Sequence, residues 1–196
     1  MQMFLSRKQK IYEDYGYILD YPVHRRVARK PALGEIAQLV GERFFLLLEA
    51  VVRPGVSLDI GERVFIGRDS RDKILYVLGL IEYQDLTDIA RSELEHVVEN
   101  IVRVNEKRFV EFFNSSTPIS PRMHALELIP GIGKKYMSVI LRERENTPFK
   151  SFTDIQQRTG IPDPARLIAK RIIEEISDPN VKYRLFTAKI ARYGIE

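Results

Sequence analysis

The chain of 196 residues contains no cysteine and no tryptophan. The absence of cysteine excludes disulfide bonds, thiolate metal sites and cysteine nucleophiles. Long apolar runs are also missing, because the longest, Phe44–Leu48, is broken at Glu49 and is far shorter than a membrane span. The N-terminus lacks the basic and then apolar order of a signal peptide. We therefore expect a cytoplasmic protein with no membrane partner.

The net charge is only +4, but the charge is unevenly distributed. Residues 85–117 hold four Lys/Arg against seven Asp/Glu, a net of −3, whereas residues 118–196 hold fourteen against nine, a net of +5. Residues 1–84 carry a net of +2. Positive charge concentrated in one part of a chain favours a polyanionic partner, although a solvated lysine-rich surface would give the same count.

The first 84 residues read as short strands separated by turns. Tyr15, Tyr17 and Tyr21 fall at alternate positions of one expected strand, and 44–52 reads as a continuous apolar strand. Several short strands with glycines at their bends are typical of a small β-barrel of the oligonucleotide-binding (OB) type. We therefore predict an OB-like β-barrel domain at residues 1–84.

The remainder of the chain is expected to be mainly helical. Residues 85–117 predict an acidic helical connector, in which Ser92 and Glu95 have the spacing of a capping box. Ser120 and Pro121 then predict a helix start within a C-terminal all-α domain at residues 118–196. Alternation in Val181–Ile190 leaves open a strand that returns to the barrel. The expected fold class is multidomain α+β.

The ten residues Leu126–Lys135 are the most informative of the chain, because an apolar segment runs into a Pro-Gly-Ile-Gly turn and then two lysines. Gly131 and Gly133 lack a Cβ, so both can adopt positive φ and let an anion approach the main chain. A helix that begins near Gly133 offers free amides and the positive end of its dipole. Lys134 and Lys135 add side-chain charge there. The pattern predicts a site for a nucleic-acid phosphate.

This stretch resembles the helix-hairpin-helix motif, whose turn reads apolar-Pro-Gly-apolar-Gly. Residues 136–145 look like the second helix, and residues 147–155 look like the connection of a tandem helix-hairpin-helix domain. Such domains bind the DNA or RNA backbone with little sequence preference. Ile132 would sit at the tip, where it either reaches toward a minor groove or packs inward.

Over its whole length the chain is similar to an archaeal family known as domain of unknown function 655, which is described as predicted RNA-binding. The matching stretches are the turn above together with Gly61–Gly67 and Arg108–Asn114. The resemblance implies a slight preference for RNA over DNA. It also implies a link to translation or transcription, with a ribosomal or transcription protein as partner.

Where a second hairpin would repeat the glycine turn, the chain instead has Gly160-Ile161-Pro162-Asp163-Pro164. Pro162 and Pro164 each lack an N–H, and the charge of Asp163 repels a phosphate. Asp163 has the character of a helix N-cap, with Pro164 at the first helical position. The second hairpin is therefore expected to be structural, while the basic residues of the following helix either extend the contact surface or face solvent.

A third candidate is the basic segment that follows the tyrosine-rich strand. It contains Arg25, Arg26, Arg29 and Lys30. Many proteins hold single-stranded nucleic acid with a basic loop that lies beside aromatic faces. The tyrosines would then stack on bases, unless they fill the core of the barrel and leave only the loop to bind.

Catalysis has little support in the sequence. The three histidines are scattered, and neither a Walker-type nor a dinucleotide-type glycine loop is present. We expect a non-catalytic nucleic-acid-binding protein with no cofactor and no metal. The alternatives are a protein-interaction module and, less favoured, a metal-dependent nuclease built from carboxylates that converge in the fold. The oligomeric state stays open.

Overall fold

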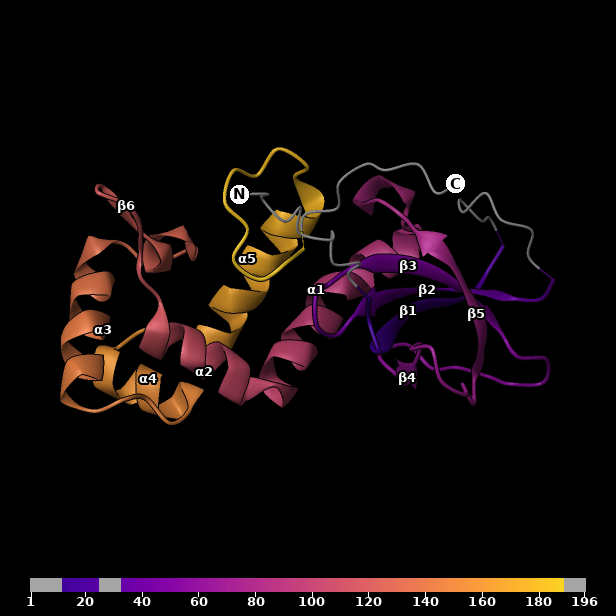
Figure 1. The fold of residues 1–196 in the computed structure, drawn as a ribbon, viewed down its shortest axis with the longest axis horizontal. Coiled ribbons are helices and arrows are strands. Elements are labelled where there is room, and N and C mark those ends of the chain that lie inside the picture. The colour runs from indigo at the N-terminus through magenta and orange to yellow at the C-terminus, as the bar shows by residue number, and fades with distance from the viewer. Residues whose placement is uncertain (1–11, 25–32, 189–196) are drawn as a thin grey trace, which may run out of the picture.

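A computed structural model of the chain describes residues 12–24 and 33–188. The molecule is elongated, with an antiparallel sheet at one end and a group of helices at the other (Figure 1). The long helix α1 (Asp88–Val104) lies between them and contacts both the sheet and α5 (Pro164–Ser177). The fold is therefore mixed α+β.

The sheet has five antiparallel strands in the order β4-β1-β2-β3-β5. Register shifts in the β1–β2 and β3–β5 pairs bend the sheet, since a bulged strand twists more strongly than a regular one. The sheet curls into half of a barrel that is open between its two edge strands. The strands are β1 (Tyr15–Val23), β2 (Ile36–Gly41), β3 (Leu47–Val52), β4 (Arg63–Phe65) and β5 (Ile74–Leu80).

Both faces of the curled sheet are covered, so β2 and β3 are buried along their whole length. Ile18, Leu39 and Ala50 belong to an apolar cluster inside the curl. Tyr17 and Leu19 point to the other face and join a second cluster that continues through α1 into the helices. The sheet and the helices therefore share one core across the expected boundaries at residues 84 and 117.

Helix α1 is attached to the sheet through its first residues. Thr87 caps the helix by accepting a hydrogen bond from the Ala90 N–H, and its hydroxyl donates to Asp20 at 2.6 Å. The buried Gln38 accepts from the Thr87 N–H at 2.9 Å. The expected capping box at Ser92 is wrong, because the helix begins four residues earlier and the Ser92 hydroxyl donates to the Ile89 carbonyl.

The loop between β2 and β3 takes up the first three residues of the strand that the sequence predicted at 44–52. Phe45 has φ +54, and its side chain is buried. The carboxylate of Glu13 accepts hydrogen bonds from the Arg43, Phe44 and Leu46 N–H groups at 2.9, 2.7 and 3.3 Å, which fixes this loop. Burial raises the pKa of Glu13. The strand therefore starts at Leu47.

The helical half, residues 105–177, starts with α2 (Glu106–Ser115) directly after α1. Instead of the helix expected at Ser120, a small hairpin forms, because Ser120 pairs with Met123 across a two-residue turn. The other elements of the helical half are β6 (Pro118–Ser120), β7 (Met123–His124), the 3₁₀ turn η2 (Ala125–Leu128), α3 (Lys134–Asn146), α4 (Phe152–Thr159) and α5. Outside this half, a further 3₁₀ turn, η1 (Tyr83–Asp85), precedes α1.

After α5 the chain turns back toward the sheet. Its described residues, 181–188, contain no strand, in contrast to the alternative that the sequence left open for 181–190. The segment does reach the sheet, since the Ala188 N–H donates to the Phe44 carbonyl at 3.3 Å.

Candidate nucleic-acid interface

The first turn, Ile129–Gly133, connects η2 to α3. The Ile132 N–H donates to the Ile129 carbonyl at 3.0 Å, Pro130 occupies the second position, and Gly131 has φ +87. This is the arrangement of a type II turn, which favours Pro followed by Gly because its third residue needs positive φ. The local sequence therefore dictates the shape of the turn.

Gly133 plays a different part from the one that the sequence suggested. Its φ is −86 and its ψ −177, so it is extended and does not need the positive φ that glycine allows. A Cβ at this position would meet nothing within 4 Å. Gly133 is the N-cap of α3 and offers no side chain to the first amides of the helix. The N-terminal end of α3 is thus left open.

Two cations flank this open helix end. Lys134 and Lys135 are exposed, and neither forms an ion pair with a described residue. The first turn of α3 also contains no acidic residue. Ile132, by contrast, is 2% exposed and belongs to the main core, so of its two expected positions the structure shows the inward one. Its side chain is not available to a ligand.

A shallow hollow of about 530 Å³ lies beside the first turn. Besides the turn itself, it is lined by Glu127, Leu128, Glu174 and the buried Arg171. Arg171 already pairs with Glu174 at 3.4 Å and with Glu175 at 3.0 Å. The carboxylates on this side repel an anion, so a phosphate has its best approach from the lysine side.

His124 fixes the chain ahead of the first turn. Its Nδ1 accepts a hydrogen bond from the Leu126 N–H at 3.1 Å, and Glu127 reciprocates by accepting from the His124 N–H at 2.8 Å. Burial and the nearby Arg144 lower the pKa of His124, which keeps the ring neutral and its Nδ1 able to accept. No pattern in the sequence indicates this role.

The second turn, Gly160–Asp163, connects α4 to α5 and contains a carboxylate, that of Asp163. Gly160 closes α4 with φ +75, and Asp163 is the N-cap of α5, as the sequence predicted. The Asp163 carboxylate accepts from the Arg166 N–H at 3.3 Å and pairs with Arg103 of α1 at 2.7 Å. Pro164 at the first helical position supplies no N–H. A carboxylate therefore occupies the place that a phosphate would need.

The basic segment Arg25, Arg26, Arg29 and Lys30 lies outside the described residues, but its flanking strands can be placed. At one end of β1, Val23 pairs with Ile36 of β2. At the other end, next to Gly41, the Glu42 carbonyl accepts from Arg108 of α2 at 3.4 Å.

The three tyrosines of β1 are engaged within the protein. Tyr17 is 3% exposed beneath the helices, so it belongs to the core. The guanidinium of Arg63 covers the Tyr15 ring at 3.4 Å from its centroid. Tyr21 donates to Glu35, and this hydrogen bond raises the pKa of Tyr21 to about 12. An open stacking surface on this strand would require these contacts to break.

Within residues 12–24 and 33–188, the histidines, aspartates and glutamates form no group of three or more that could hold a metal ion. None of the helices in the same ranges combines the length and the apolar character that a membrane span requires.

The structure thus defines a mixed α+β protein with a half-barrel sheet. The N-terminus of α3 is open and flanked by lysines, whereas the N-terminus of α5 is capped by Asp163. The chain belongs to the family described as "Protein of unknown function (DUF655)", whose model matches residues 12–188. The chain is 46% identical over 182 residues to the uncharacterized protein MJ0038 of Methanocaldococcus jannaschii. The aligned region covers 92% of this chain and 82% of that protein. It is also similar to the crystal structure of Af1531 from Archaeoglobus fulgidus, a member of the same family, with a TM-score of 0.81, 46% identity, and coverage of 90% of this chain and 100% of that one.

Proposed function

We propose that the protein binds nucleic acid without catalysis, through phosphates that dock at the first turn and the N-terminus of α3. The observation that carries the proposal is the contrast between the two turns. Only the first leaves its helix without a capping side chain and places two exposed lysines beside it. Free amides and the helix dipole together attract anions, and phosphates are the anions that such ends most often hold.

Two resemblances support this function. The two turn-and-helix units, residues 129–146 and 160–177, resemble a tandem helix-hairpin-helix domain with one equipped hairpin and one structural hairpin. The curled sheet, with five strands and an open side, resembles an OB-like barrel, a fold that often binds oligonucleotides. Both resemblances point to the same class of ligand from opposite ends of the molecule.

The contact would be blind to base sequence. The amides and lysines would contact phosphates, and the buried side chain of Ile132 cannot reach a base. Phosphate contacts also do not separate RNA from DNA, so the preference for RNA rests on the description of the archaeal family that the chain resembles. A role near translation or transcription has the same basis.

The proposal is tested by measuring the affinity for a fluorescent single-stranded RNA, and for DNA of the same sequence, at several salt concentrations. Changing both lysines, Lys134→Glu with Lys135→Glu, should weaken binding and reduce the slope of log affinity against log salt by about 2, roughly one for each cation removed. The matched control is Arg166→Glu with Lys170→Glu, which makes the same charge change on α5. It should reduce binding far less.

Unchanged affinity in the lysine variant would end the proposal. Equal losses in the two variants would mean that binding follows net charge and not the first turn. An affinity that does not respond to salt would point instead to the protein-interaction alternative.

A further inference from the structure

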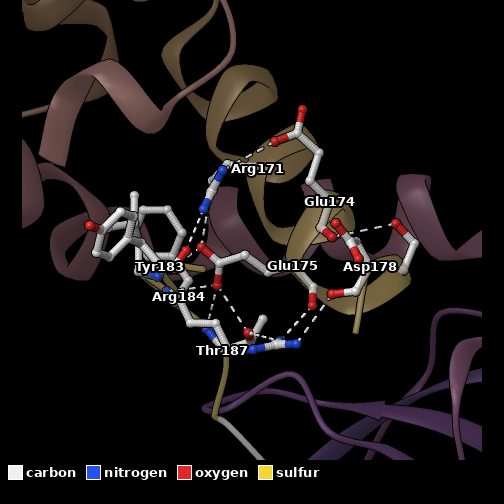
Figure 2. A network of polar contacts seen from close by, with 10 residues as sticks. Arg171, Glu174, Glu175, Asp178, Tyr183, Arg184 and Thr187 are labelled. Atoms are coloured by element: carbon white, nitrogen blue, oxygen red, sulfur yellow. Dashed lines mark hydrogen bonds and ion pairs between the residues drawn. The ribbon is translucent and has the colours of Figure 1, made fainter. Parts of the chain in front are cut away.

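One buried carboxylate accepts the backbone hydrogen bonds of three residues in the segment that follows α5. Glu175 is 0% exposed and points from α5 into the loop formed by residues 181–188 (Figure 2). Its two oxygens accept hydrogen bonds from three successive N–H groups, those of Leu185, Phe186 and Thr187, at 2.7, 3.2 and 3.0 Å. The Thr187 hydroxyl also donates to it at 2.9 Å. A side chain thus replaces the hydrogen-bond ladder that a helix or strand would supply.

Two arginines complete this network. Arg171, one turn earlier on α5, pairs with Glu175 at 3.0 Å and donates to the Tyr183 carbonyl. Arg184 reaches back to the Glu175 carbonyl and donates to the Thr187 hydroxyl at 2.9 Å (Figure 2). The buried charge of Glu175 is therefore paired, as burial of an ionised group requires.

The same segment bridges the two ends of the molecule. The Phe186 ring packs edge-on against Phe109 and Phe112 of α2, with centroids 5.6 and 5.0 Å away. Ala188 then bonds to the Phe44 carbonyl of the sheet. A hollow of about 310 Å³ lies beside the segment, which forms part of its wall. Its walls are mostly apolar and include Phe45, Leu47, Ile81 and Ile176, with Thr187 and Ala188 on the segment side.

We propose that residues 181–188 form a strap with one latch, the Glu175 carboxylate, and that release of this latch opens the apolar hollow while the rest of the fold stays closed. Three amides share one acceptor, so the loss of Glu175 frees all of them together. The sheet and helices do not depend on the strap to stay joined. Helix α1 already connects them through Thr87 and through core residues such as Leu94 and Ile101.

The wild-type protein offers a first test. Native-state hydrogen exchange in low urea should show the amides of Leu185, Phe186 and Thr187 opening together, before those of β2 and β3. Exchange of the strap amides only at the urea concentration where β2 and β3 also exchange would overturn the proposal.

The variant Glu175→Gln offers a second test, with Glu174→Gln on the same helix as its control, since Glu174 is half exposed and contacts no strap amide. Glu175→Gln should speed exchange of the three strap amides by about tenfold or more and increase binding of a hydrophobic dye, while β2 and β3 stay protected. Unchanged strap exchange in that variant, or an equal effect of Glu174→Gln, would contradict a latch at Glu175.

Should Glu175→Gln unfold the whole chain, Thr187→Val offers the alternative, because it removes one donor to the carboxylate, together with the hydroxyl that accepts from Arg184, and leaves the pair of Glu175 with Arg171 intact. Faster exchange confined to the strap supports the latch. Exchange that rises everywhere, or nowhere, refutes it.

Discussion

The two turns of the helical half precede helices of similar length, yet they treat the first amides of those helices in opposite ways. At Asp163 the chain supplies its own carboxylate, which is held in place by Arg103 from α1. At Gly133 it supplies no side chain and follows with Lys134 and Lys135. The arrangement at Asp163 stabilises the fold from within, whereas the one at Gly133 leaves the first amides of α3 free to attract an anion. Free helix amides beside two exposed lysines are groups that suit a turn to an anionic ligand.

The largest expected effect concerns what the two turns share, a buried isoleucine. Ile132 is 2% exposed and Ile161 is 0% exposed. Replacing either by Ala should lower the free energy of unfolding by about 2–4 kcal/mol, because each change leaves a cavity in the core. Urea denaturation measures this loss, and Ile89→Ala, at a site 53% exposed, should change stability little. A variant Ile132→Ala that keeps full stability but binds nucleic acid poorly would show that Ile132 is a contact residue after all.

A smaller loss of stability is expected at the self-capped turn. Asp163→Ala removes the cap of α5, the pair with Arg103 and a residue that tolerates positive φ. We expect it to cost about 1–2 kcal/mol, mostly through the cap, since the ion pair is half exposed. Asp163→Asn should retain most of the stability because Asn also caps and also accepts positive φ. Nucleic-acid affinity should not fall in either variant, and a clear fall would place the second turn in the interface.

The smallest change in stability is expected when the first turn is made to imitate the second. Gly133→Asp would supply a capping carboxylate, and the open space at this position accommodates it. Stability should rise by about 0.5 kcal/mol, while affinity for nucleic acid should fall by about tenfold because the carboxylate occupies the anion site. Gly133→Asn has the same shape without the charge, so it should lose less affinity. Wild-type affinity in the Asp variant would mean that phosphate does not dock at this helix end.

Much of both turns could be predicted from the sequence because their chemistry is local. Pro130 followed by Gly131 specifies the turn type, and Asp163 followed by Pro164 specifies a capped helix start. The general α+β character and the short strands follow from similarly local patterns. The one local error at these turns concerns Gly133, whose glycine leaves space and does not provide positive φ.

What could not be predicted depends on residues that are distant in the chain. Arg103 lies 60 positions before its partner Asp163, and no spacing rule connects them. Glu13 holds the loop at Phe45 from about thirty positions away and thereby delays the start of β3. Such long-range contacts are decided by the tertiary fold. The hairpin that replaces the expected helix at Ser120 is different, because Ser120 pairs with Met123 only three positions later.

The contrast between the two turns is tested most directly by the backbone amide resonances of the two helix starts during titration with a short single-stranded RNA. We predict that the amides of Lys134, Lys135 and Tyr136 shift as the RNA is added and return as salt is raised. The amides of Ala165 and Arg166 should stay unchanged. Shifts at α5 without shifts at α3, or no shift at either helix while the RNA binds, would contradict the account.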